Sequence, residues 1–166
     1  MCPPRDNGWA VGGLGQIVYT GDGGSSWTRQ ELTCDWPTCN KRLFALDSVG
    51  TAEGWIAGEG LYHTSNGGSL WAMQEMEIET DFNDVQFVDA AHGCLAGNYG
   101  LILYTEDGGT SWALAYNDVS ASHLRGLSFV SPEQGWFVGD GGTILTTIQV
   151  PYWSVHLPLV IGADAG

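Results

Sequence analysis

Basic residues are scarce in this chain of 166 residues. Five lysines and arginines stand against 19 aspartates and glutamates, which gives a formal net charge of −14 at pH 7. Nucleic-acid binding depends on clustered lysines and arginines, so the composition argues against a nucleic-acid partner. An acidic surface favours solubility and suits cations or basic proteins as partners, although solvated acidic loops account for the charge equally well.

Long hydrophobic runs are also missing. The longest apolar stretch, residues 155–161, is interrupted by His156 and Pro158. A membrane-spanning helix needs about 20 consecutive apolar residues, so the sequence predicts no membrane span. Long segments with apolar residues at helical spacing are absent too, which leaves no sign of a helical core.

Cysteines are few, and four are present in all. Cys34 and Cys39 lie in one short polar segment, where a disulfide would contribute about 2 kcal/mol and imply an oxidising compartment. The alternatives are that the two cysteines are free thiols or that they bind a metal ion. No second cysteine pair and no nearby histidine accompany them, so they are a weak signal for a zinc site. Cys94 occupies a position where other repeats have tryptophan, which predicts an inert buried thiol. No signal peptide precedes Cys2, so we expect either a cytoplasmic chain or, as the repeats favour, a piece of a longer secreted protein.

An eight-residue motif occurs three times. The copies read TGDGGSSW from Thr20, TSNGGSLW from Thr64 and TEDGGTSW from Thr105, so they start 44 and 41 residues apart. The chain also has 25 glycines and eight tryptophans. A period near 40 residues in such a composition is typical of stacked units of about four β-strands, as in a β-propeller.

A second motif, a short apolar run bounded by glycines, reads as a buried strand. It occurs at residues 8–12, 54–58, 93–97 and 135–139. A third strand is expected after each copy, at 16–20, 61–64, 101–105 and 143–147, and an innermost strand before three of them, at 43–46, 85–88 and 127–130. The sequence therefore predicts an all-β propeller of about four four-stranded antiparallel blades, forming one domain over residues 1–166 with units at 8–32, 43–76, 83–116 and 124–157.

Two units depart from the pattern. The first lacks an innermost strand, because Pro3 and Pro4 remove hydrogen-bond donors from the segment before it. The fourth has no octapeptide. The tail from Tyr152 is expected either to form the outer strand of the fourth unit or to fill the vacant inner position of the first and close a ring.

Each position of the octapeptide has an expected structural role. Asp22, Asn66 and Asp107 are expected to accept hydrogen bonds from backbone amides two residues on. The glycine pairs allow positive φ, and Ser25, Ser69 and Thr110 cap the turn. The tryptophans cover the blade, and truncation of each to alanine is expected to cost about 3–5 kcal/mol. The predicted structural residues are Asp22, Gly23, Gly24, Trp27, Asn66, Gly67, Gly68, Trp71, Asp107, Gly108, Gly109 and Trp112.

The octapeptide resembles the Asp-box, or BNR repeat, and the whole pattern over residues 8–147 resembles the photosystem II stability/assembly factor family. Members form seven-bladed propellers about twice this length, so the resemblance implies half a propeller or a compact four-bladed form. It implies a non-catalytic scaffold that binds a protein partner through loops and faces, in an extracytoplasmic compartment such as the periplasm, a thylakoid-like lumen or the exterior. Those factors use an arginine-rich surface, whereas Arg29, Arg42 and Arg125 lie in different units here.

Two other functions fit the same motifs. One is a carbohydrate-binding or sialidase- or glycosidase-like Asp-box module, with a glycan as partner; the other is a structural repeat segment of a larger extracellular protein. Glycosidase chemistry needs two facing carboxylates, which sequence cannot pair among the loop acids Glu59, Asp84, Asp118, Glu133 and Asp140. The histidines are isolated, so we expect no catalytic residues, no metal and no cofactor. Binding is expected on loops 13–15, 59–60, 98–100 and 140–142, and self-association through open blade edges.

Overall fold

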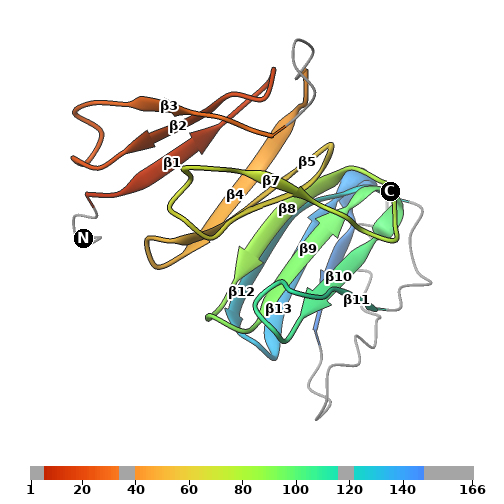
Figure 1. Ribbon diagram of the computed structural model, residues 1–166. Helices are drawn as coiled ribbons and strands as arrows, with labels where there is room; N and C mark the ends of the chain where they lie inside the picture. The colour runs from red at the N-terminus through yellow and green to blue at the C-terminus, as the bar shows by residue number, and fades with distance from the viewer. Residues whose placement is uncertain (1–5, 34–39, 116–121, 148–166) are drawn as a thin grey trace. The chain divides into compact units, whose positions relative to one another are not determined.

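The computed structural model describes residues 6–33, 40–115 and 122–147. Within them the strands form four antiparallel sheets, and helical structure is limited to two three-residue 3-10 turns, η1 (Asn98–Gly100) and η2 (Asp140–Gly142) (Figure 1). None of these residues forms a helix with the length and hydrophobicity of a membrane span. The all-β prediction is confirmed.

The chain divides into two compact units, Met1–Glu79 and Thr80–Gly166. The first unit holds two sheets, with strand orders β1-β2-β3 and β4-β5-β6-β7. Their strands are β1 (Gly8–Val11), β2 (Ile17–Thr20), β3 (Thr28–Gln30), β4 (Leu43–Val49), β5 (Glu53–Gly58), β6 (Gly60–Thr64) and β7 (Ala72–Gln74). Within each sheet, every strand pairs with the next one along the chain, which is the blade pattern predicted from the motifs.

The second unit repeats this arrangement, with strand orders β8-β9-β10-β11 and β12-β13-β14. Its strands are β8 (Phe82–Phe87), β9 (Gly93–Gly97), β10 (Ile102–Thr105), β11 (Ala113–Ala115), β12 (Leu124–Ser131), β13 (Gln134–Gly139) and β14 (Ile144–Thr146). The chain separates into two compact units, and each is described by itself. The prediction of a single propeller domain over residues 1–166 therefore stays a prediction.

Every predicted strand of the described segments is present, within three residues at either end. The first sheet lacks an innermost strand before β1 in residues 6–33, as expected. The fourth sheet has three strands within residues 122–147. The tail from Tyr152 and the Cys34–Cys39 pair lie outside the described residues, so ring closure and the disulfide stay predictions.

The core of the first unit lies between its two sheets. Trp9, Val11 and the fully buried Ile17 from one sheet pack against Ile56 and Tyr62 from the other. These side chains meet because alternate residues of a strand point to the same face. Burying large apolar side chains of this size stabilises the fold by about 1.5–3 kcal/mol each.

The core of the second unit joins β8–β11 to β12–β14 in the same way. Cys94, Ala96 and Ile102 pack against Phe137 and Leu145, and all five are nearly or fully buried. Burial raises the pKa of the Cys94 thiol to about 12, so the group stays protonated at physiological pH. The prediction of an inert buried thiol at this position is confirmed.

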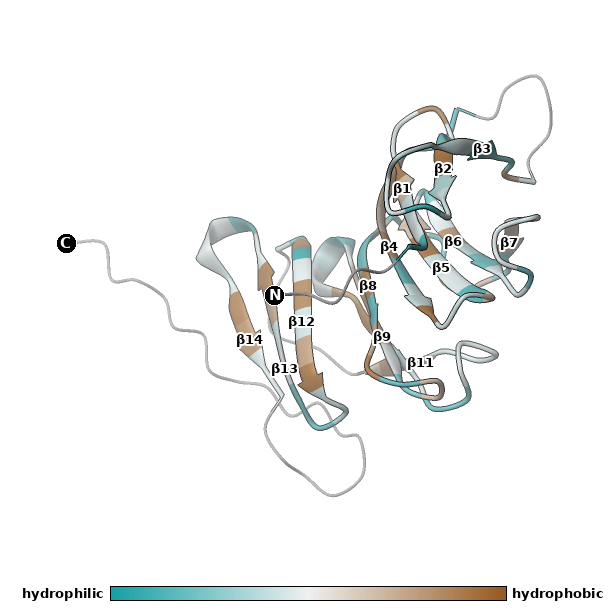
Figure 2. Ribbon diagram, turned by 90° about the vertical axis from the view of Figure 1, so that its left-hand side faces the viewer, coloured by the Kyte–Doolittle hydropathy of each residue, from teal (hydrophilic) through white to brown (hydrophobic). Residues whose placement is uncertain are grey.

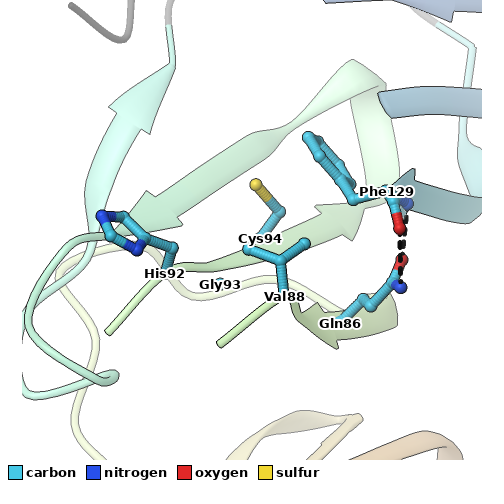
Figure 3. A pocket seen from close by; sticks show the side chains of 6 residues that line it. All are labelled: Gln86, Val88, His92, Gly93, Cys94 and Phe129. Carbon is cyan, nitrogen blue, oxygen red and sulfur yellow. Dashed lines mark hydrogen bonds between the residues drawn. The ribbon is translucent and has the colours of Figure 1, made fainter. Parts of the chain in front are cut away.

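A side-chain amide also ties these two sheets together. Gln86 on β8 accepts a hydrogen bond from the Phe129 amide at 2.7 Å and donates one to the Phe129 carbonyl at 3.2 Å (Figure 3). His92, Cys94 and Phe129 line a small hollow beside this bridge. Gln86 thus makes two hydrogen bonds from its side chain to the backbone of the other sheet. The two sheets are separate, so no backbone ladder joins them at this point.

Candidate functional site

The octapeptide turns close on themselves through a buried threonine. In the first copy the Thr20 hydroxyl donates to Asp22 Oδ1 at 2.8 Å and accepts from the Gly24 amide at 2.9 Å. Asp22 Oδ1 in turn accepts from the Ser26 amide at 2.8 Å. One hydroxyl and one carboxylate therefore bind the Gly24 and Ser26 amides, while the Gly23 amide donates to the Asp6 carbonyl at 2.8 Å.

The second and third copies repeat these bonds. Thr64 and Thr105 occupy the place of Thr20. Asn66 and Asp107 occupy the place of Asp22, and each accepts a hydrogen bond from the threonine hydroxyl. The expected bond to an amide two residues on is wrong, because the amides that bind Asn66 and Asp107 lie four residues on, at 3.0 and 2.9 Å. The threonine hydroxyl occupies the closer position, so the carboxylate or amide oxygen reaches further along the turn.

Both glycines of each pair have positive φ, between 67° and 92°. This is the left-handed region, where a Cβ atom is strained. The Ser25 and Thr110 hydroxyls donate to the carbonyls of Asp22 and Asp107 at 3.1 and 3.0 Å. These bonds hold the turn at a second point.

The motif tryptophans are not equally buried, which corrects the expectation that all three cover the blade. Trp71 is fully buried, whereas Trp27 is 49% exposed. Trp71 is covered by the preceding sheet, since its indole donates to Gln30 Oε1 at 3.0 Å and its backbone bridges to Leu32. In residues 6–33 no sheet precedes β1, so Trp27 lies against its own turn beside Gly24.

The charged turn residues are fixed as anions. Hydrogen bonds from the side chain and backbone of Ser26 lower the pKa of Asp22 from 3.8 to about 2. Bonds from Ser111 lower the pKa of Asp107 to about 2 in the same way. A carboxyl group that stays ionised at neutral pH cannot donate a proton, so these turns do not supply a general acid.

The opposite ends of the strands carry a different repeated feature, a β-bulge at the start of each innermost strand. The register of β4, β8 and β12 shifts there, which leaves Phe44, Asn83 and Arg125 as the extra residues. A bulge re-aims a side chain and is common beside functional sites. Each bulge residue lies next to the loop between the second and third strands of its own sheet.

The bulge brings a carbonyl against that loop. The first loop residue donates its amide to the carbonyl preceding the innermost strand: Glu59 to Arg42, Asn98 to Asp81 and Asp140 to His123, at 2.9–3.1 Å. A Cβ on the motif's closing glycine, Gly58 or Gly139, would lie within 2.5 Å of the same carbonyl. Glycine is therefore required at these positions because the backbone of the innermost strand approaches so closely. The glycine that closes each motif is thus the trace that the bulge leaves in the sequence.

In the second unit the bulge and loops form a cluster, which we call the Tyr99 cluster: Asn98, Tyr99, His123, Arg125 and Asp140. Tyr99 is 73% exposed and has φ of 57°, a conformation that non-glycine residues rarely adopt. Its ring lies 5.0 Å from that of His123, and its amide donates to His123 Nδ1 at 3.3 Å.

A bidentate ion pair borders the Tyr99 cluster. Arg125 donates from Nε and Nη2 to the two carboxylate oxygens of Asp140, at 3.0 and 2.7 Å. This pairing lowers the pKa of Asp140 and raises that of Arg125. The cluster thus presents an aromatic ring, an imidazole and a fixed ion pair on one exposed surface, a set suited to hydrogen bonding and stacking.

The first unit offers a smaller version of this surface. Leu14 is 62% exposed with φ of 60°, at the same place in its loop as Tyr99. Arg42 bonds Glu59 and lies 5.6 Å from the centre of the Phe44 ring. The Arg42 bond lowers the pKa of Glu59, so this carboxylate is also held ionised.

The remaining acids bond backbone amides or lie in turns, and Asp84 lies within strand β8 rather than in a loop as expected from the sequence. Asp84 accepts from the amides of Val85 and Leu127, at 2.9 and 2.8 Å, and Glu133 accepts from the Ser131 hydroxyl. Asp118 lies outside the described residues. Among the residues that the structure describes, no group of three or more histidines, cysteines or carboxylates is placed to hold a metal ion.

Sequence reasoning located the loops but did not single out the side chains of the Tyr99 cluster and of the Phe44 bulge. Loops 13–15, 59–60, 98–100 and 140–142 all lie between second and third strands, as expected. Tyr99, His123 and Phe44 carried no motif signal, because an isolated aromatic residue in a loop has no characteristic spacing. Arg125 and Asp140 lie 15 residues apart and meet because β12 and β13 pair with Leu124 opposite Gly139.

Comparison with known proteins gave matches in sequence and in structure. The family model described as "Photosynthesis system II assembly factor YCF48" matches residues 3–74 and 69–155. The "Photosystem II assembly lipoprotein Ycf48" of Synechococcus sp. (strain CC9902) is 34% identical over 159 residues, covering 90% of this chain and 46% of that protein. The chain thus spans about half the length of this relative.

Two solved structures show the fold at low identity. One, "YCF48 bound to D1 peptide", has 21% identity and a TM-score of 0.59, covering 86% of this chain and 61% of the other. The other, an ancestral GH74 enzyme, has 14% identity and a TM-score of 0.70, covering 89% and 22%. At these identities the likeness establishes the β-propeller fold and no more.

Proposed function

The chain belongs to the Ycf48 family of photosystem II assembly factors, and from this premise we propose that it is a non-catalytic scaffold that binds a protein partner. The partner we propose is a peptide segment of the D1 type, because a family structure is described as bound to a D1 peptide. The binding surface we propose is the Tyr99 cluster. The observation that carries this assignment is Tyr99 itself, an exposed aromatic side chain held in a left-handed backbone conformation.

Strain of this kind supports a binding role. A non-glycine residue with positive φ costs about 1–3 kcal/mol and persists where the surroundings hold it in place. Here the His123 contact and the loop bonds hold it. Tyrosine is favoured at binding surfaces because it offers a large contact area and a polar end while losing little side-chain entropy.

The fixed charges support a scaffold rather than an enzyme. Asp140 and Glu59 are each paired with an arginine, and both have lowered pKa values. A glycosidase of the common type needs one carboxylic acid with a raised pKa facing a carboxylate. Asp140 and Glu59 are held in the opposite state, which supports the absence of catalysis.

We also propose an extracytoplasmic location, which the description of the cyanobacterial relative as a lipoprotein supports. The octapeptides are proposed to be structural. Their buried hydroxyls are engaged in internal hydrogen bonds, and Thr20, Thr64 and Thr105 are at most 5% exposed. Groups committed in this way are poorly placed to bind a partner.

Binding of tiled D1 peptides to the 166-residue chain tests the proposal. Fluorescence anisotropy with labelled peptides is expected to find at least one saturable ligand. Tyr99→Ala should weaken it by about tenfold or more, the usual loss at an aromatic hot spot. Leu114→Ala, at another exposed apolar side chain, is the matched control and should bind like the wild type. Absence of any saturable peptide, or equal affinities for the two variants, would count against this surface.

A further inference from the structure

The loop that carries Tyr99 is attached to its neighbours by a side-chain amide. Strand β12 lies beside β8 and β9 (Figure 2), and the turn η1 packs against β12. Asn83 on β8 donates from Nδ2 to Asn98 Oδ1 at 3.0 Å and to the Leu124 carbonyl at 2.7 Å. The first residue of the loop is therefore tied to the start of β12 by a group that does not titrate.

Tyr99 itself is held by a histidine. Its backbone amide donates to Nδ1 of His123 at 3.3 Å, and the two rings lie 5.0 Å apart with their planes tilted by 57°. The backbone of His123 is anchored in turn, because its carbonyl accepts a hydrogen bond from the Asp140 amide at 2.9 Å. His123 thus reaches from a fixed position to a tyrosine whose backbone is left-handed, with φ of 57°.

The bond between the Tyr99 amide and His123 requires a neutral imidazole. An uncharged histidine has one ring nitrogen that carries a proton and one that accepts a hydrogen bond, whereas both nitrogens of the charged ring carry protons. Since Nδ1 accepts from the Tyr99 amide, the proton of the neutral ring lies on Nε2. A second proton can bind only at Nδ1, where it replaces the acceptor with a donor that faces the Tyr99 N–H.

The first unit holds the equivalent loop in another way. Leu14 occupies the place of Tyr99 there, with φ of 60°. A bond that holds its loop runs from the Gly15 amide to the Lys41 carbonyl at 2.7 Å. A backbone carbonyl accepts whatever the pH, so this bond does not depend on a proton. The imidazole of the second unit therefore adds a proton-dependent contact to a loop type that the fold can also hold through its backbone.

The charged groups beside His123 keep their state while a histidine titrates. Arg125 on β12 and Asp140 in η2 are bonded to each other, and this pairing, with a smaller effect of His123, lowers the pKa of Asp140. Asp81, which precedes β8, adjoins η1 through its backbone carbonyl, and the titratable group of η1 is the Tyr99 phenol. Histidine is the side chain that ordinarily changes charge between about pH 5 and 8. In that range the Arg125–Asp140 pair stays charged.

We propose that neutral His123 positions Tyr99 for binding and that protonation of Nδ1 releases it, so that the Tyr99 cluster loses affinity for its peptide as the pH falls from 8 to 5. The inference rests on the proposed function in one respect, namely that Tyr99 contacts the peptide. Affinity falls because binding must then restore a strained backbone conformation that has lost its acceptor. The Asn83 bonds keep the loop attached, so the change is confined to Tyr99.

NMR of the free chain tests the positioning step without a ligand. The ring nitrogen shifts of His123 are expected to show the Nε2–H tautomer at pH 8, and the Tyr99 amide resonance should move together with the titration of the ring. In His123→Asn the side-chain Oδ1 takes the place of Nδ1 as an acceptor that does not titrate, so the Tyr99 amide should stay constant from pH 8 to 5. An Nδ1–H tautomer at pH 8, or a wild-type Tyr99 amide that ignores the titration, would overturn the proposal.

Fluorescence anisotropy with the labelled D1 peptides at pH 8 and pH 5 tests the effect on binding. The wild type is expected to bind about five- to tenfold more weakly at pH 5. His123→Asn should bind equally well at both pH values, and His123→Leu, which offers no acceptor, should bind weakly at both. His92→Asn is the matched control, because His92 bonds Asp89 in a turn of the same unit, and it should keep the wild-type pH dependence.

The comparison between variants separates His123 from other titrating groups. Circular dichroism at both pH values confirms that each variant is folded. An equal loss of affinity in the wild type and in His123→Asn, or tighter wild-type binding at pH 5, would overturn the proposal. If no D1 peptide binds at either pH, the proposed function fails, and the NMR titration decides whether His123 positions Tyr99.

Discussion

Trp9 and Trp71 donate their indole N–H groups to the same atom, Oε1 of Gln30, at 2.9 and 3.0 Å. The two tryptophans come from different sheets of the first unit, and both pack in its core. Gln30 completes its role by donating from Nε2 to the Gly67 carbonyl at 3.1 Å. One amide therefore joins a strand, a neighbouring blade and an octapeptide turn.

Replacing this amide should destabilise the first unit. Gln30→Leu is expected to lower the free energy of unfolding by about 2–4 kcal/mol, because two indole donors lose their acceptor. Urea denaturation followed by tryptophan fluorescence measures the change. Gln16→Leu, at an exposed position, is the control and should change stability by less than about 0.5 kcal/mol. Equal effects would show that solvent or another acceptor replaces Gln30.

The motif tryptophans should differ in their contribution to stability. Trp71→Ala is expected to cost about 3–5 kcal/mol because the side chain is fully buried. Trp27→Ala should cost less than about 2 kcal/mol, since half of its surface already contacts solvent. Thermal and urea unfolding of the two variants measure the difference. Similar losses of unfolding free energy would mean that Trp27 is covered in solution.

The buried threonine should matter more than the exposed hydroxyl of the same turn. Thr105→Val keeps the shape but removes the acceptor for the Gly109 amide and the donor to Asp107, at an expected cost of about 1–3 kcal/mol. Thr110→Val removes only an exposed bond and should cost less than about 1 kcal/mol. Hydrogen exchange at Gly109 should accelerate in the first variant alone. Unchanged exchange there would show that the hydroxyl does not hold the amide.

Acid should loosen the first and third turns before the second. The pKa of Asp22 and Asp107 falls from 3.8 to about 2 on folding. A lowered folded-state pKa contributes stability that is fully present above about pH 4 and is lost as the pH falls towards 2. Asn66 does not titrate, so its turn is the internal reference.

NMR titration of the turn amides measures this behaviour. The amides of Ser26 and Ser111 should shift with midpoints near pH 2, while that of Leu70 stays constant. The double variant Asp22→Asn, Asp107→Asn should lose this part of the pH dependence of unfolding. Midpoints near 3.8 at both sites would show that the Ser26 and Ser111 bonds do not form in solution.

The blade pattern could be predicted from sequence because it is local. Glycine pairs and the Gly-Trp run fix turns and strands within a few residues, and the structure has them where they were expected. Burial could not be predicted in the same way, since Trp27 and Trp71 share a motif and differ only in whether a sheet precedes them. The Tyr99 cluster was equally hidden, because Tyr99 and His123 are 24 residues apart and meet only through tertiary packing.

Side-chain hydrogen bonds within the eight residues hold the bend of the octapeptide turn, as the bonds of Thr64 and Asn66 show. Such a segment carries its conformation with it when it is copied to a new place in a gene. Duplication of a repeat then yields a blade whose sharpest bend already works, and selection is left to adjust only the sheet faces. Adding or losing a repeat would therefore disturb the sheet faces more than the bend within a blade.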